Sequence, residues 1–239
     1  MTGVQTCALP ISVLNPLVVR LLFPVLALAV AVKAREYGWG LLNLYDLPYW
    51  VSFAAAIILL DMVVYLQHLM FHAAPLLWRF HMIHHADLDY DVTTGLRFHP
   101  IEIIISMLIK MAAVAVLGPP VGAVVAFEVI LNGMAMFNHG NVGLPKGFDR
   151  ILRLLVVTPD MHRVHHSIYP RETNSNFGFN LSWWDRIFGT YIAQPKDGHL
   201  GMTIGLRQFR NAAEVTLPRL LILPFTGKQG KYALGRRGT

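Results

Sequence analysis

The chain alternates between long apolar runs and shorter polar segments. Four runs, at residues 17–32, 49–67, 101–117 and 121–137, contain few charged side chains. A bilayer core of about 30 Å requires roughly 20 mostly apolar helical residues, and the first run is somewhat shorter than that. The pattern predicts an all-α integral membrane protein with about four transmembrane helices.

The connection between the last two runs predicts their topology. Gly118, Pro119 and Pro120 are the residues that separate them. Because glycine and proline end helices and form turns, we expect a helical hairpin with almost no loop. The hairpin crosses the membrane and returns, so the chain after residue 137 lies on the same side as the segment before residue 101.

Histidines gather in the polar segments on that side. Eight of the 11 histidines fall in three motifs: His68-x3-His72, His81-x2-His84-His85 and His162-x2-His165-His166. Residues three or four apart share one face of a helix, and imidazole is a common metal ligand. The predicted topology lets the three motifs meet, so we expect a polyhistidine metal centre at one membrane surface.

Three further polar residues are candidates for the same centre. His139 follows the fourth run on the histidine side, and we interpret it as a further ligand. His99 precedes the third run at the same level. Its side chain is a candidate for one of three roles: a metal ligand, a hydrogen-bond partner of a ligand, or a helix cap. Asn141 is a candidate for a ligand or a partner of one.

Asp61 interrupts the second run and lies on one helical stripe with Tyr65, His68 and His72. A carboxylate inside a membrane span is costly and needs a partner. We expect Asp61 to accept a hydrogen bond from a ligand histidine and so to orient its ring. The alternative is a polar contact between helices.

Composition and charge agree with a membrane protein. The chain is 54% hydrophobic and 14% charged, against about 25% charged in soluble domains. Arg20 and Lys110 lie within runs and Lys33 and Arg35 lie on the opposite side, which leaves 16 of 20 basic residues on the histidine side. The positive-inside rule then predicts that the histidines face the cytoplasm. We expect the membrane to be a bacterial inner membrane. No nucleic-acid-binding motif is present, so we expect no nucleic-acid partner.

The number and type of ligands favour two metal ions. A single zinc needs about four ligands, fewer than the clustered histidines provide. Carboxylate-bridged di-iron proteins use Glu and Glu-x-x-His on bundle helices, and none of the five glutamates is placed in that way. A histidine-dominated di-iron site is therefore our interpretation, although imidazole also suits zinc, copper and nickel. The single cysteine, Cys7, excludes cysteine-based clusters.

The two ends of the chain differ from its centre. Residues 1–11 (MTGVQTCALPI) resemble a translated sequencing adapter, and we interpret them as non-native; the nucleotide sequence tests this. We expect a single membrane domain over residues 12–226, with its core motifs at about 45–195. Residues 227–239 are rich in glycine and basic residues, which predicts a flexible tail.

The histidine motifs and the residues around them resemble the fatty acid hydroxylase/sterol desaturase superfamily of membrane di-iron oxygenases. The flanking matches are Asp61-x3-Tyr65-x2-His68, Trp78-Arg79-x-His81, Arg97-x-His99-Pro100, Thr158-Pro159-x2-His162, Asn176-Phe-Gly178 and Trp184-Asp185-x2-Phe188-Gly189-Thr190. The resemblance implies four membrane helices under a cytosolic metal-binding cap. It also implies two iron ions on the eight clustered histidines with His139 as a ninth ligand, and O2 as co-substrate. It assigns no catalytic residue beyond the metal centre.

The function implied by this resemblance is hydroxylation of an unactivated C–H bond of an apolar lipid. Desaturation on the same scaffold is the runner-up, and a non-redox membrane metal-binding or transport protein is the alternative of another class. A transporter would place polar ligands near the bilayer midplane, whereas these histidines lie at the ends of the runs. The His-Pro-Gly-Gly haem motif of a fused cytochrome b5 is absent, so we expect no fused haem or flavin. Electrons would come from a separate ferredoxin or cytochrome b5-like donor with its reductase.

Overall fold

The structure, a computed structural model, describes residues 26–226, 230 and 232–234. The predicted first run at 17–32 lies partly outside these residues, and the adapter-like segment 1–11 lies wholly outside them. Within the described part, the end of the first run belongs to helix α2, Leu26–Glu36.

Three long helices form the apolar part of the molecule: α3 (Tyr49–Ala73), α5 (Pro100–Leu117) and α6 (Val121–Asn138). Among the described residues, these three are long and apolar enough to cross a membrane. They coincide with the second, third and fourth predicted runs. Helix α3 continues beyond the predicted end, so His68 and His72 lie on the spanning helix itself.

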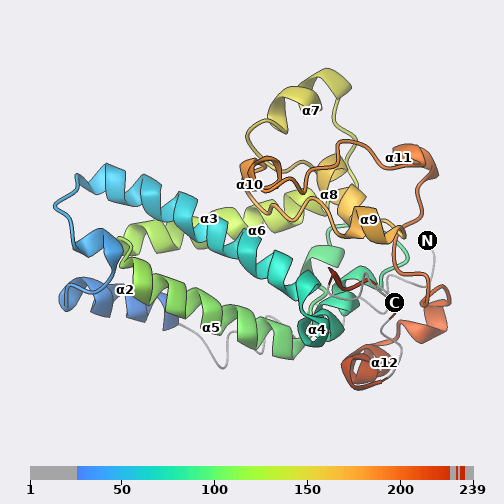
Figure 1. Ribbon diagram of the computed structural model, residues 1–239, viewed down its shortest axis with the longest axis horizontal. Coiled ribbons are helices and arrows are strands. Elements are labelled where there is room, and N and C mark those ends of the chain that lie inside the picture. Colours follow the sequence, from blue (N-terminus) through green and yellow to red (C-terminus); the bar gives the residue numbers. More distant parts are fainter. Residues whose placement is uncertain (1–25, 227–229, 231, 235–239) are drawn as a thin grey trace.

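The long helices pack around α3. Helices α5 and α6 each lie against it, and α2 packs against α5 and α6 (Figure 1). The buried contacts between them include Ala31, Leu60, Val114, Val124 and Phe127. Alanine on α2 allows a close approach of the helices, and the larger side chains fill the remaining space.

The hairpin between α5 and α6 turns at Gly118, as predicted. Its φ is 60°, in the left-handed region that glycine adopts without strain. A Cβ atom there would also clash with the backbone oxygen of Trp39. Conformation and space therefore both require glycine at this turn.

A cap of short helices covers one end of the bundle (Figure 1). Its elements are α4 (Pro75–His85), η2 (Thr94–Leu96), α7 (Lys146–Leu152), α8 (Pro159–His165), α9 (Pro170–Thr173), α10 (Trp183–Ile187), α11 (Gly198–Gly201), η3 (Ala212–Glu214), α12 (Leu217–Ile222) and η4 (Leu223–Phe225). At the other end, η1 (Leu41–Asn43) lies between α2 and α3. Extended pairing in the described part is confined to isolated bridges, such as Val156 with Leu181.

The apolar core of the cap includes part of the predicted tail. Trp78, Met82 and Phe209 pack there with Tyr232 and Ala233, which are 3% and 1% exposed. Tyr232 Oη donates to the backbone oxygen of Ile168 at 2.8 Å. At these two residues the structure differs from the flexible tail expected for 227–239, because the aromatic ring is buried in the cap.

Candidate metal centre

The three histidine motifs and His139 converge at the junction of the bundle and the cap. They form a five-histidine cluster (His68, His72, His81, His85 and His165) and a four-histidine cluster (His84, His139, His162 and His166). Within each cluster, one ring nitrogen of every histidine lies within 4.8 Å of the others. All nine side chains are buried. The predicted convergence on one side of the bundle is confirmed.

Each of the two His-x2-His-His motifs contributes histidines to both clusters. In the first motif, His81 and His85 join the five-histidine cluster and His84 joins the other. In the second motif, His162 and His166 join the four-histidine cluster and His165 crosses to the five-histidine cluster. Residues four apart share a helical face, whereas adjacent residues lie about 100° apart around the axis. Each motif therefore serves both clusters.

Six of the nine rings are oriented by a hydrogen bond from Nδ1. The acceptors are Phe177 O for His68 (2.9 Å), Asn174 Oδ1 for His72 (3.2 Å), Glu102 Oε1 for His81 (2.6 Å), Thr94 O for His84 (3.1 Å), Ala135 O for His139 (2.7 Å) and Ser175 O for His165 (2.7 Å). Carbonyl and carboxylate oxygens only accept, so Nδ1 carries the proton and Nε2 presents its lone pair.

The Nε2 atoms of these rings either lack a protein partner or face the Nε2 atom of another histidine. Those of His68, His72 and His165 are buried and have no hydrogen-bond partner among the described residues. Those of His84 and His139 lie 3.2 Å apart, although both rings carry their proton on Nδ1. Facing lone pairs repel each other unless a cation lies nearby. This donor set fits metal ions bound by neutral imidazoles whose outer nitrogens are held in place.

Burial keeps the imidazoles of His84, His165 and His166 neutral. It lowers the pKa of His165 from the ordinary 6.5 to about 3. It also places the pKa values of His84 and His166 well below 6.5, with neighbouring histidines adding to the effect. A neutral imidazole is the form that binds a metal, so the rings need no deprotonation at neutral pH.

His99 and Asn141 lie outside both clusters. His99 caps the N-terminus of α5: its Nδ1 accepts from Ile101 N at 3.1 Å, and its Nε2 donates to Leu221 O at 3.3 Å. Of the three roles considered, the structure places His99 in that of helix cap. Asn141 is exposed, and its side-chain oxygen accepts from Arg163 Nη2 at 3.0 Å.

The expectation that Asp61 orients a ligand histidine is wrong, because its hydrogen-bond partners are residues of the cap. Its carboxylate accepts from Asn180 N, Leu181 N and Trp184 Nε1, the last at 2.8 Å. The cap chain folds back along α3 at this level, about two turns before His68, and its donors reach Asp61 first. Asp61 therefore fastens the cap to the bundle, which is the polar-contact alternative.

Three positioning residues were not foreseen from the sequence. Glu102 and Asn174 hold His81 and His72, as described above. Asp185 accepts from Phe177 N and Gly178 N, both at 2.8 Å, and so fixes the loop whose Phe177 carbonyl holds His68. An acidic residue in the first turn of an apolar run was a usable signal for Glu102, and Asp185 lies in one of the motifs that carry the family resemblance. The role of Asn174 depends on the folded cap.

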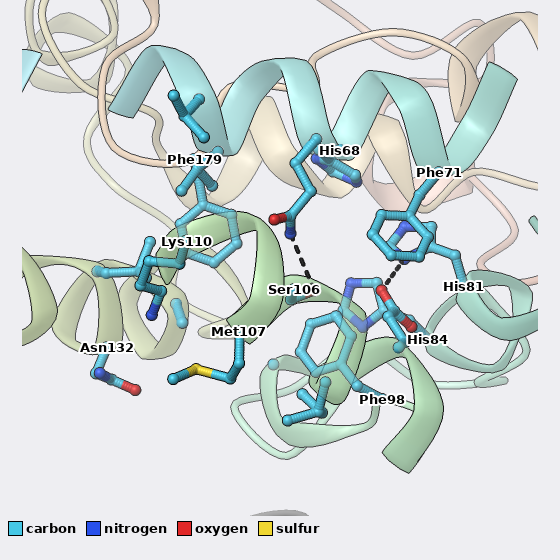
Figure 2. A pocket seen from close by; sticks show the side chains of 18 of the residues that line it. His68, Phe71, His81, His84, Phe98, Ser106, Met107, Lys110, Asn132 and Phe179 are labelled. Carbon is cyan, nitrogen blue, oxygen red and sulfur yellow. Dashed lines mark hydrogen bonds and ion pairs between the residues drawn. The ribbon is translucent and has the colours of Figure 1, made fainter. Parts of the chain in front are cut away.

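A cavity of about 290 Å³ lies between α3, α5 and α6 and reaches the histidines. Its histidine end includes His68, His81, His84 and His162. Figure 2 shows the first three together at one side, with Phe71 and Phe98 beside them. Most of the remaining wall is apolar, so the cavity suits a hydrocarbon chain.

Fold and site together define a helical integral membrane protein with a histidine-rich centre at one end of its bundle. The sequence model of the family described as "Fatty acid hydroxylase" matches residues 53–190. The chain belongs to this family, as the residue motifs predicted.

Curated relatives include lipid hydroxylases and monooxygenases. The chain is 32% identical to the ornithine lipid hydroxylase OlsE of Rhizobium tropici over 90% of its own length and 62% of that protein. It is 29% identical to the alkylglycerol monooxygenase of Xenopus tropicalis, covering 75% of the chain and 40% of the relative, and 28% identical to that of Homo sapiens, covering 76% and 40%. The chain thus spans about two fifths to three fifths of these relatives. No solved structure matches it.

Proposed function

We propose that the chain is a membrane oxygenase that hydroxylates an unactivated C–H bond of a lipid with O2 and external electrons. The observation that carries the proposal is the convergence of nine buried histidines, in two clusters, at the end of an apolar cavity. The names of the relatives support a lipid substrate and favour hydroxylation over desaturation.

The five-histidine and four-histidine clusters would each hold one iron ion. When bound, the irons supply the activation of O2, which the side chains of the chain itself cannot perform. The protein contributes the geometry: the Nδ1 hydrogen bonds fix the rings, and Glu102 holds His81 with a charged acceptor. Position also argues against transport, because the clusters lie at the end of the bundle and not at its midplane.

The cavity would present the lipid to this centre. Its apolar walls bind the hydrocarbon chain and exclude water, which directs oxidation to the bound chain. Phe98 stacks on His84 with ring centroids 4.5 Å apart and so closes the wall beside that ring. A C–H bond of a chain in the cavity then lies next to His68, His81 and His84.

We further propose that the histidine end faces the cytoplasm of a bacterial inner membrane. The excess of basic residues on that side supports this orientation. A separate ferredoxin or cytochrome b5-like protein would dock there and deliver electrons. Alkaline phosphatase and green fluorescent protein fusions after residue 239 test the orientation, because the two reporters are active on opposite sides of the membrane.

The experiment for the activity uses protein purified from cells supplied with iron. We expect about two irons per chain, O2 uptake with a chemical reductant, and incorporation of ¹⁸O into a lipid. His84→Ala should lose activity and metal, whereas His199→Ala, outside both clusters, should retain both. Stoichiometric zinc without O2 uptake would contradict the proposal. Lipid profiles of cells with and without the gene then identify the substrate.

A further inference from the structure

The cavity contains an ion pair that the proposed metal chemistry does not use. Lys110 of α5 and Glu128 of α6 both line it, with Lys110 Nζ 2.7 Å from Glu128 Oε1. Their side chains are 15% and 34% exposed, so the pair is not enclosed by protein. Ionisable residues inside membrane spans are costly and commonly mark a substrate or ion site.

The pair lies at the end of the cavity away from the histidines. On α5, Glu102, Ser106 and Lys110 are spaced four residues apart and share one face. At 1.5 Å per residue, Lys110 is about 12 Å along the axis from Glu102, the residue that contacts His81. Figure 2 shows Lys110 and Asn132 at one side, the histidines at the other and Ser106 between them.

The pair retains hydrogen-bonding capacity for a ligand. An ammonium group has three donors, and Glu128 is the single hydrogen-bond partner of Lys110 in the described part of the chain. Asn132 donates to the backbone oxygen of Glu128 at 2.7 Å, which leaves its side-chain oxygen as an acceptor. The site therefore offers donors and acceptors side by side and has no net charge.

Bridging two helices does not by itself explain the pair. Helices α5 and α6 pack against α2 and α3 more extensively than against each other, and Lys110 and Glu128 join them across the cavity. An apolar pair would fill the same space at a lower desolvation cost. A polar ligand would give the charged side chains of Lys110 and Glu128 a role that bridging the helices does not.

We propose, building on the oxygenase function above, that Lys110, Glu128 and Asn132 bind an uncharged polar group of the lipid. The group both donates and accepts hydrogen bonds, as an amide or a hydroxyl does. A neutral group matches the neutral pair, whereas a free carboxylate would face Glu128. Binding this group at the Lys110 end of the cavity, away from the histidines, fixes which carbon reaches the metals.

Direct binding to purified, metal-loaded protein in detergent tests the site. The probes are radiolabelled N-methylhexadecanamide and hexadecane, which have equal chains and differ in the amide. We expect the wild type to bind the amide about 10-fold more tightly. The double variant Lys110→Met/Glu128→Leu should lose this preference. Asp149→Asn, which breaks an ion pair in α7, should keep it. A double variant that keeps the preference would overturn the proposal.

A single substitution tests the site with less change to packing. Glu128→Gln leaves the Lys110 charge without its counterion, so hexadecanoate should bind this variant more tightly than it binds the wild type. Unchanged binding of hexadecanoate would refute the recognition role. The binding measurement does not require catalytic turnover, so the two proposals can fail separately. A chain that lacks oxygenase activity but prefers the amide over hexadecane refutes only the oxygenase function. An active chain without this preference refutes only the proposed polar-group site.

Discussion

Replacing Glu102 should weaken one of the two metal sites and leave the other intact. His81 Nδ1 donates to Glu102 Oε1 at 2.6 Å, and the two side chains are 3% and 5% exposed. A short, buried hydrogen bond to a charged acceptor contributes about 1.5–3 kcal/mol. At about 1.4 kcal/mol per tenfold change, this equals a factor of about 10–100 in metal affinity. Losses of partners that orient metal-binding histidines fall in the same range, about 10–100-fold.

Glutamine and alanine at position 102 should lower the metal affinity by different amounts. Glu102→Gln keeps an acceptor oxygen and the shape but loses the charge, so we expect about 10-fold weaker binding. Glu102→Ala removes the acceptor and should approach 100-fold, that is, about 2.8 kcal/mol. Because His81 belongs to the five-histidine cluster, only the metal of that cluster should be affected.

Anaerobic titration of metal-depleted protein with iron(II), in competition with a chelator, measures both affinities. Glu128→Gln is the matched control, because this carboxylate lies on a neighbouring membrane helix and bonds to Lys110 and not to a histidine. Its metal affinities should equal those of the wild type. Wild-type affinity in Glu102→Ala, or an equal loss in the control, would refute this account of Glu102.

Three other predictions concern the cap. Asp61→Asn should lower the melting temperature while the folded protein keeps its metal; loss of metal without loss of stability would restore the ligand-orienting role. Arg97→Met leaves Asp87 buried without its 3.1 Å ion pair and should cost about 3–5 kcal/mol in denaturant unfolding, partly rescued by adding Asp87→Asn. Because burial lowers the pKa of His165 to about 3, the unfolded chain binds a proton near pH 6.5 that the folded chain does not. The unfolding free energy of metal-depleted protein should therefore fall as the pH drops from about 6.5 towards 5, and a flat profile would contradict this.

The membrane helices and the convergence of histidines could be predicted because they depend on local pattern and topology. Apolar length located the three described spans, and Gly118-Pro119-Pro120 located the hairpin. Once the hairpin returned the chain to the same side, His162 and its neighbours had to lie near the other two motifs. These conclusions need no knowledge of how the cap folds.

The division of ligands and the residues that hold them could not be predicted in this way. His84 and His85 are adjacent in sequence but belong to different clusters, which depends on the rotation of α4 relative to α8. Most Nδ1 acceptors are backbone carbonyls such as that of Phe177, and these carry no signal in side-chain identity. Asp61 was misassigned because its partners come from a cap segment more than 100 residues away.

Anomalous diffraction at the iron absorption edge, on crystals of protein loaded with iron, tests the central claim most directly. We predict two peaks, one bounded by the five-histidine cluster and the other by the four-histidine cluster, with His84 and His85 facing different peaks. A single peak, or a signal at the zinc edge alone, would contradict the account.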